Sequence, residues 1–312
     1  MTSVPMAVGL VGSGAVGQAV GGALVTAGVG GRLLVASRTD EQSGALADDL
    51  ADMQTAVGSP VRPIAAATGD LRDCEAVVIA VRASFVNTRG TDVRMGGARA
   101  NAQLIGTLAC ELHGYTGTVL MVTNPVDLMA RRFAEVSDCR RVFGIGSGLD
   151  TARYRLTLAR LLGVPVAEVK GHVIGEHGEA AVVCASSTTV NDEPVPVPRR
   201  AIRAIRDELT QRPGRINAGI GRTRSGPAGA VVTALRLALA VEDGVTELST
   251  GYGDDFLGIP LRFTRGEPVP SMPPLDPVEA GELEAARGKL RAAYQMVSGI
   301  PPQPLPSERN PS

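Results

Sequence analysis

A glycine-rich turn close to the start of the 312-residue chain restricts its fold more than any other stretch. The apolar run from Met6 to Val11 is followed at once by Gly12-Ser-Gly-Ala-Val-Gly17, and an alanine-rich helical pattern continues to about Ala27. In such a strand–turn–helix unit the glycines allow a tight turn and the approach of a pyrophosphate, and the helix amino terminus favours the anion. We therefore predict a dinucleotide-binding site, with a purely structural glycine turn as the alternative. The expected contact residues are Gly12, Ser13, Gly14, Ala15, Val16 and Gly17.

Apolar runs and helical patterns alternate over the first half of the chain. Further strands are expected at 32–36, 61–65, 75–81, 117–122 and 141–145, and helices from Asp40, at 98–112 and after Asp127. This alternation over residues 6–147 predicts a doubly wound parallel sheet of the Rossmann type.

The pattern changes after residue 148. Expected strands lie at 168–174, 179–187, 246–252 and 258–263, and expected helices at 148–162, 199–210, 228–242 and 277–297. Strands that follow one another around turns predict an α+β part with antiparallel pairing. We therefore predict an α/β protein with a Rossmann domain at 1–147, a substrate or catalytic domain at 148–300 and a proline-rich disordered tail at 301–312.

The composition excludes several classes of partner. With 31 basic and 32 acidic residues, no net field favours nucleic acid or an anionic membrane. No basic segment precedes a long apolar core at the amino terminus, and the apolar run near 230–241 is interrupted by Arg236. The four cysteines form neither a CxxC pair nor a metal spacing, so we expect buried thiols, no metal and a cytoplasmic protein.

The end of the second expected strand bears on the choice of cofactor. An acidic residue usually binds the ribose 2′-hydroxyl of NAD at this place, but the chain has Ala36-Ser37-Arg38-Thr39. A hydroxyl on Ser37 and a guanidinium on Arg38 would bind a 2′-phosphate, which an acid would repel. The sequence therefore favours NADP(H) over NAD(H), unless Arg38 is merely exposed. Thr39 and Gln42 are spaced as a capping box for the helix that follows.

A histidine between glycines is the strongest candidate for acid–base chemistry. His177 lies in Gly175-Glu-His-Gly178, and Asp150 and Arg153 lie three residues apart at the start of an expected helix. That spacing puts both side chains on one helix face, where the carboxylate could orient the imidazole and the guanidinium could bind a substrate carboxylate. The alternatives are a turn histidine and a solvated helix face. The polar segment from Arg82 to Arg94, with three arginines and Gly90, resembles a lid.

Taken in order, these motifs resemble the lactate/malate dehydrogenase family. The resemblance covers nearly the whole chain and rests on Gly12–Gly17, Thr123-Asn-Pro-Val-Asp127, Gly148–Arg155, Gly175–Gly178 and Tyr252–Pro260. It implies that His177 exchanges the proton, with Asp150 as its partner, and that Arg153 binds the substrate carboxylate. It also implies that Arg94 polarises the reacting carbonyl and that Asn124 contacts both nicotinamide and substrate.

Two departures from the family pattern concern the substrate. The segment from Arg82 to Arg94 is a few residues longer than in ordinary members, so Arg89 is the best candidate for a second anion contact, with Arg82 and Thr88 as alternatives. Thr223 falls at the family's substrate wall and is flanked by two arginines, in Gly221-Arg-Thr-Arg-Ser-Gly-Pro227. A substrate larger or more acidic than pyruvate or oxaloacetate is therefore expected.

The resemblance implies an NADP(H)-dependent oxidoreductase that reduces a 2-oxo acid to a 2-hydroxy acid. A catalytically silent dinucleotide-binding protein and a hydrolase like the NAD-dependent glycosidases are the alternatives. The hydrolase needs a Cys/His metal site, but Gly144-Ile-Gly-Ser-Gly148 contains neither residue. Leu46, Leu50 and Met53 recur at helical spacing, and their family counterpart packs across a two-fold axis, so a homodimer or homotetramer is expected.

Overall fold

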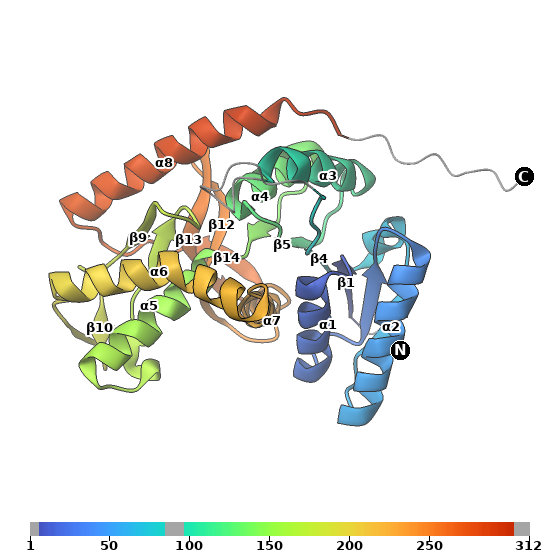
Figure 1. The fold of residues 1–312 in the computed structure, drawn as a ribbon, viewed down its shortest axis with the longest axis horizontal. Coiled ribbons are helices and arrows are strands. Elements are labelled where there is room, and N and C mark those ends of the chain that lie inside the picture. Colours follow the sequence, from blue (N-terminus) through green and yellow to red (C-terminus); the bar gives the residue numbers. More distant parts are fainter. Residues whose placement is uncertain (1–5, 85–96, 303–312) are drawn as a thin grey trace, which may run out of the picture.

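A large mixed sheet runs through the molecule in the computed structural model, which describes residues 6–84 and 97–302 (Figure 1). Its amino-terminal part has parallel strands in the order β3-β2-β1-β4-β5-β6. The strands are β1 (Ala7–Val11), β2 (Arg32–Ala36), β3 (Arg62–Ala65), β4 (Ala76–Ile79), β5 (Thr118–Met121) and β6 (Val142–Gly144). The order reverses between β1 and β4, which confirms the predicted Rossmann arrangement.

Helices cover both faces of this parallel part, and β1, β4 and β5 are buried along their whole length. The helices are α1 (Ala15–Ala27), α2 (Asp40–Val57), α3 (Ala98–Glu111) and α4 (Val126–Ser137), with a 3₁₀ turn, η1 (Thr68–Asp73). Strands that are buried on both faces read as continuous apolar runs, which is why they could be located in the sequence.

The predicted capping box of α2 forms on one side only. The Thr39 hydroxyl accepts a hydrogen bond from the backbone N–H of Gln42 at 3.3 Å, as expected for a cap. The Gln42 side chain does not return to Thr39, because its oxygen accepts a hydrogen bond from the Ser37 hydroxyl instead.

Antiparallel strands continue the main sheet beyond β6, and the predicted α+β character of this half is confirmed. The order is β12 (Gly244–Tyr252), β13 (Asp255–Thr264), β8 (Val173–Gly175) and β9 (Ala181–Val183), with β14 (Glu267–Pro270) paired to β13. A second sheet consists of β11 (Glu193–Pro194), β10 (Thr189–Val190) and β7 (Val169–Lys170). The helices are α5 (Ser147–Leu162), α6 (Arg199–Ile220), α7 (Ser225–Ala238) and α8 (Pro277–Ser298), and η2 (Val166–Glu168) is a 3₁₀ turn.

Two predicted elements of this half differ from the structure. The strand expected at 168–174 is divided into β7 and β8, which belong to different sheets. At the break, a Cβ on Gly171 would lie 2.5 Å from the ring of Tyr154. The backbone can pack against this ring only because Gly171 has no side chain. The helix expected to end at residue 210 continues to Ile220 and contains Pro213, a residue that commonly ends helices.

Glycines lie at two narrow pairings of the main sheet: one joins the parallel part to the antiparallel part, and the other joins β13 to β8 within the antiparallel part. Ser249 of β12 pairs with Gly144 of β6, and Gly258 of β13 pairs with Gly175 of β8. A Cβ on Gly144 would lie 2.8 Å from the Cβ of Ser249, and a Cβ on Gly258 would lie 1.7 Å from the Ser147 Oγ. Both joints therefore depend on the absence of a side chain.

Side chains from both halves share one hydrophobic core. The rings of Phe143 and Phe263 meet edge to face with centroids 6.0 Å apart. In Figure 1, α7 lies beside α1, and α8 passes beside α4. The division into domains at residue 147 therefore stays a prediction.

Two of the three residues of the apolar stripe of α2 pack in the core of a single chain, whereas Met53 is half-buried, so the stripe alone does not support a subunit interface. Leu46 and Leu50 are only 5% and 3% exposed within one chain. A Cβ on Gly21 of α1 would lie 2.7 Å from the Leu50 Cδ1, which shows how closely α2 packs on α1. The expected homodimer or homotetramer stays a prediction without this stripe as its support.

Two expectations from composition can be compared with the described residues. No helix in residues 6–84 or 97–302 is long and apolar enough to cross a membrane. Cys74, Cys139 and Cys184 are buried, but Cys110 lies on the outer side of α3 and is exposed, contrary to the expectation that all four thiols are buried.

Candidate active site

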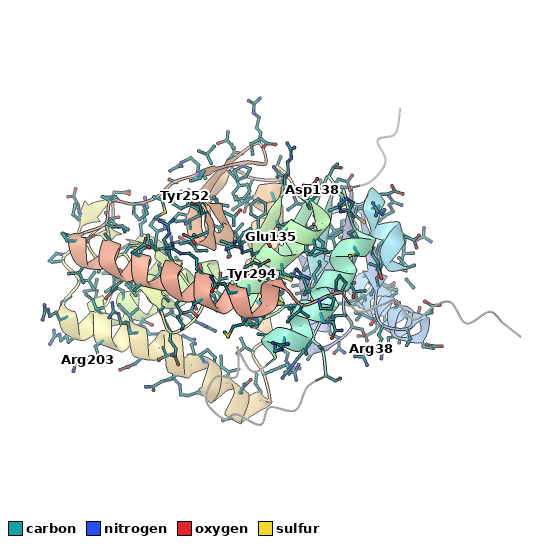
Figure 2. All side chains as sticks on the ribbon, turned by 90° about the horizontal axis from the view of Figure 1, so that it is seen from above. Arg38, Glu135, Asp138, Arg203, Tyr252 and Tyr294 are labelled. Atoms are coloured by element: carbon teal, nitrogen blue, oxygen red, sulfur yellow. The ribbon has the colours of Figure 1, made fainter. Side chains whose placement is uncertain are left out.

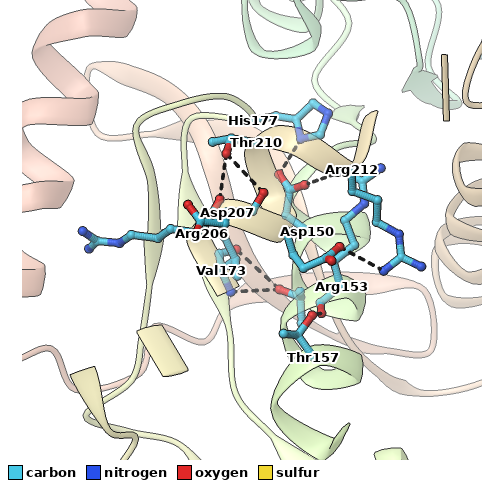
Figure 3. Close-up of polar contacts among 11 residues, drawn as sticks. Asp150, Arg153, Thr157, Val173, His177, Arg206, Asp207, Thr210 and Arg212 are labelled. Atoms are coloured by element: carbon cyan, nitrogen blue, oxygen red, sulfur yellow. Dashed lines mark hydrogen bonds and ion pairs between the residues drawn. The ribbon is translucent and has the colours of Figure 1, made fainter. Parts of the chain in front are cut away.

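The structure brings together His177, Asp150 and Arg153 (Figure 3). The His177 Nδ1 lies 2.6 Å from the Asp150 Oδ2, and the Arg153 Nη1 donates to the Asp150 Oδ1 at 3.1 Å. All three side chains are buried. A carboxylate on Nδ1 orients the imidazole and stabilises its protonated form, which leaves Nε2 as the nitrogen that can exchange a proton. The geometry predicted from the three-residue spacing is therefore present.

The segment before α5 makes room for the imidazole. Gly146 ends the link between β6 and α5, and a Cβ at this position would lie 2.5 Å from the His177 Cγ. On the other side, Gly175 turns the chain with a φ of 85° just before the histidine. The sequence Gly144-Ile-Gly-Ser-Gly148 shows only a lack of metal ligands, and it does not predict the contact of Gly146 with the imidazole.

Asp127 is a second carboxylate beside the histidine, and sequence reasoning did not assign it a role. Its Oδ2 accepts the backbone N–H of His177 at 2.9 Å. Burial raises the pKa of Asp127, while the nearby Ser249 hydroxyl and the His177 N–H act in the opposite direction. The sequence feature that could have pointed to Asp127 is its position at the end of the Thr123–Asp127 motif.

Asn101 connects the turn that carries Asn124 to the segment that follows β4. Its side-chain oxygen accepts the Ala83 N–H at 2.8 Å, and its amide donates to the Asn124 carbonyl at 2.7 Å. The Thr123 hydroxyl makes a similar link to the Val81 carbonyl at 2.7 Å. Asn124 therefore lies at the carboxyl edge of the parallel strands, where the glycine turn after β1 also lies.

The glycine turn has the shape that a dinucleotide needs. Gly12 has a φ of 117°, and a Cβ there would lie 2.7 Å from the Ala80 carbonyl oxygen. A Cβ on Gly17 would lie 1.8 Å from the Gly12 carbonyl oxygen. These two glycines are required by the turn itself, whereas a Cβ on Gly14 would meet nothing within 4 Å. Gly14 therefore leaves open space where a pyrophosphate could approach the backbone at the start of α1.

Hydroxyl groups link the glycine turn to the end of β2. The Ser13 and Ser37 hydroxyls lie 2.7 Å apart, and the Ser37 hydroxyl donates to the Gln42 side-chain oxygen at 3.2 Å. Arg38 is exposed at the edge of the molecule (Figure 2), and among the described residues it has no hydrogen bond or ion pair. Because its side chain contacts Ser37, Gln42 is a third candidate for contact with the ribose of the cofactor. The sequence predicts only a capping role for this residue.

The predicted substrate residues are only partly placed. Arg89 and Arg94 lie outside the described residues, as does Thr88. The Thr223 Oγ1 is buried without a hydrogen-bond partner among residues 6–84 and 97–302. Just after it, a Cβ on Gly226 would lie 3.0 Å from the Leu149 Cδ1, so the start of α7 packs beside the residue that precedes Asp150. Within the same described ranges, no three His, Cys, Asp or Glu side chains are grouped as a metal site.

Comparisons with known proteins agree with this geometry. Residues 6–144 match the family model described as lactate/malate dehydrogenase, NAD binding domain. An L-lactate dehydrogenase of Halalkalibacterium halodurans is 26% identical over 269 residues, which are 82% of this chain and 86% of the relative. An L-2-hydroxycarboxylate dehydrogenase (NAD(P)(+)) of Methanocaldococcus jannaschii is 30% identical over 186 residues, which are 55% of this chain and 59% of the relative.

Solved structures show the same fold over almost the whole chain. The lactate dehydrogenase of Cryptosporidium parvum, determined with lactic acid and nicotinamide adenine dinucleotide, matches with a TM-score of 0.86 and 21% identity over 96% of this chain and 99% of its own. The malate dehydrogenase of Plasmodium falciparum matches with a TM-score of 0.85 and 20% identity over 95% of this chain and 99% of its own. Residues 6–144 are therefore similar to the NAD-binding domain of the lactate/malate dehydrogenase family, and the chain as a whole resembles lactate and malate dehydrogenases in sequence and fold.

Proposed function

We propose that the protein reversibly reduces a 2-oxo acid to a 2-hydroxy acid with NADPH as the preferred reductant. The observation that carries this proposal is the buried contact of His177 and Arg153 with one carboxylate, Asp150. A proton donor and an anion clamp held by the same carboxylate suit a substrate whose carbonyl is next to a carboxylate.

Each residue of this group has a separate task. The nicotinamide supplies the hydride to the carbonyl carbon when it is bound. His177 gives its Nε2 proton to the carbonyl oxygen, and Asp150 stabilises the imidazolium before the transfer; such a step accelerates reactions by roughly 10²–10⁴-fold. Arg153 has five N–H donors, so its contact with Asp150 is compatible with two parallel hydrogen bonds to the substrate carboxylate. Arg94, by family resemblance, stabilises charge that develops on the reacting oxygen.

The preference for NADPH is supported by what surrounds the ribose site. No carboxylate lies at the end of β2, and the Ser37 hydroxyl and the exposed Arg38 both lie there. A guanidinium in this place can form charge-assisted hydrogen bonds with a 2′-phosphate.

The substrate is proposed to carry a second anionic group or a longer side chain than pyruvate. The buried Thr223 Oγ1 is unsatisfied within the described part of the chain, and buried hydroxyls normally find a partner. A substrate atom would satisfy it, and the exposed Arg222 and Arg224 on either side supply positive charge for a distal carboxylate. Arg89 is proposed as a further anion contact, by its place in the family pattern.

One experiment tests the function as a whole. The protein is incubated with NADPH or NADH and a series of 2-oxo acids, and the absorbance of the reduced cofactor is followed. We expect cofactor oxidation that depends on the 2-oxo acid and is lost in His177→Asn. Tight binding of NADPH without turnover of any 2-oxo acid would instead favour the catalytically silent protein. The hydrolase is not favoured, because the similar proteins reported above are dehydrogenases and the segment Gly144-Ile-Gly-Ser-Gly148 supplies neither cysteine nor histidine.

A further inference from the structure

Two carboxylates hold His177, and they reach it from different halves of the molecule. Asp150 of α5 contacts the imidazole at Nδ1, and Asp127 of α4 accepts the backbone N–H at 2.9 Å. Asp127 is 3% exposed. The orientation of the ring and the position of its backbone are therefore controlled by separate residues, and only the first is explained by the proton transfer.

Asp127 belongs to the element that also carries Asn124. It lies in the first turn of α4, three residues after Asn124, whose carbonyl accepts the Asn101 amide at 2.7 Å. Asn124 is the proposed contact to nicotinamide and substrate. A hydrogen bond from His177 to Asp127 thus links the proton donor directly to the turn that faces the hydride donor.

The far side of Asp127 meets the joint between the two parts of the sheet. Its Oδ1 and the Ser249 Oγ are both buried, and neither has a hydrogen-bond partner that satisfies normal geometry in the described residues. Ser249 is the residue of β12 that pairs with Gly144 of β6. A buried carboxylate with a single good hydrogen bond is unfavourable for stability, so its presence here is better explained by the contact with His177 than by packing.

We propose that Asp127 is a positioning residue, which fixes the backbone of His177 to the Asn124 turn and thereby sets the distance between the imidazole and the nicotinamide. It acts through the geometry of an acceptor oxygen and not through its charge. This inference rests on the proposed dehydrogenase function, because the positioned group is the proton donor of that reaction.

The first test separates positioning from charge by substitution. Asp127→Ala removes the acceptor, and we expect kcat to fall about 10–100-fold, because displacing a catalytic group by about 1 Å can cost 10²-fold. The KM for the cofactor should stay within about twofold, since the glycine turn is untouched. Asp127→Asn keeps an acceptor oxygen and should restore kcat to within about threefold of the wild type, with the same pH profile of kcat/KM. If the alanine variant does not fold, Asp127→Ser replaces it, because its shorter side chain cannot reach the N–H.

Glu279→Ala is the matched control. Glu279 is 5% exposed and also accepts a backbone N–H, that of Ser186 at 2.8 Å, but it is outside the proposed site. This variant should lose stability and keep kcat. An unchanged kcat in Asp127→Ala would overturn the proposal, and so would an asparagine variant that is as slow as the alanine variant, because the charge would then be what matters.

The second test needs no turnover. The chain has three histidines, so the ring-proton NMR signal of His177 can be assigned by comparison with His113→Asn and His172→Asn. We expect Asp127→Ala to shift or broaden the His177 signal and to leave the other two unchanged, whereas Asp127→Asn should resemble the wild type. An unchanged His177 signal in the alanine variant would overturn the positioning role. An inactive wild type with the expected NMR changes would refute the proposed function alone.

Discussion

The imidazole of His177 lies against the bare backbone of Gly146: a Cβ at Gly146 would lie 2.5 Å from the His177 Cγ. Real side chains do not approach this closely, so Gly146→Ala must move the ring or the start of α5. We expect kcat to fall about 100-fold with NADPH binding retained, because a small misplacement of a catalytic group has this effect. Gly288→Ala, where a Cβ meets nothing within 4 Å, is the control and should keep full activity. Wild-type kcat in Gly146→Ala would show that the loop adjusts freely.

Replacement of Arg153 by lysine should cripple turnover although the charge is kept. An ammonium cannot form two parallel hydrogen bonds to a carboxylate, and it would also alter the contact with Asp150. Loss of one charged hydrogen bond predicts a decrease of roughly 10–100-fold in kcat/KM for the 2-oxo acid. Steady-state kinetics measure this, with Arg160→Lys on the exposed side of α5 as the control. Full activity in Arg153→Lys would refute the clamp.

The cofactor preference should reverse in the double variant Ser37→Asp/Arg38→Ile. The new carboxylate would bind the ribose hydroxyls of NADH and repel a 2′-phosphate, and the lost guanidinium removes hydrogen bonds worth about 1.5–3 kcal/mol each. The ratio of kcat/KM for NADPH and NADH is measured in both proteins and in the control Arg62→Ile, which changes an exposed arginine of β3. A wild type that prefers NADH would show that Arg38 does not contact the cofactor.

The distal end of the substrate should be sensed by Arg222 and Arg224. We expect the wild type to prefer 2-oxo dicarboxylic acids over 2-oxo monocarboxylic acids of the same chain length. In Arg222→Ala/Arg224→Ala, kcat/KM for the dicarboxylic acids should decrease about tenfold more than for the monocarboxylic acids, as expected for loss of a charged contact. Arg203→Ala, at an exposed position of α6, is the control (Figure 2). Equal losses for both substrate classes would contradict a role in charge recognition.

The stability of the fold should depend on pH through Asp127. Burial raises the pKa of this carboxyl in the folded state, so the folded protein holds the proton more tightly than the unfolded chain. The contribution of Asp127 to stability is then present below its unfolded pKa, near 3.8, and is lost as the pH rises through the folded value. Relative to the wild type, Asp127→Asn should become more stable as the pH increases from 4 upwards. Thermal unfolding at several pH values measures the difference in Tm, with the exposed Asp48→Asn as the control; a Tm difference that is constant with pH would contradict the prediction.

The parallel half of the fold could be predicted because its signals are local. The second strand was placed at Arg32–Ala36, as found, since an apolar run buried on both faces is bounded by turn residues. Strands of two residues such as β10 and β11 have no periodicity to detect, and β14 includes Pro268 and Pro270. The division of β7 from β8 depends on which distant strand each one pairs with, which no local pattern records.

In the candidate site, too, the residues that lie in local motifs could be predicted, and those that act over long separations in the chain could not. His177, Asp150 and Arg153 lie in motifs whose spacing carries their chemistry, and the structure brings them into contact. Asp127 and Gly146 were missed because each acts on the histidine across a long separation in the chain, through a backbone N–H or through the absence of a Cβ. A hydrogen-bond acceptor for a backbone group has no spacing rule that would reveal it.

The narrow sheet pairings at Gly144 and Gly258 both lie between the strands that carry the glycine turn and the strand that leads to His177. The cofactor loop is mounted on the parallel strands and the histidine loop on the antiparallel ones, and each joint is only one residue pair wide. We therefore expect the distance between a bound nicotinamide and the His177 imidazole to depend on how closely the bare backbone packs at these two pairings. We expect Gly144→Ala or Gly258→Ala to displace the cofactor loop relative to the histidine loop, although neither new methyl group would contact the nicotinamide or His177.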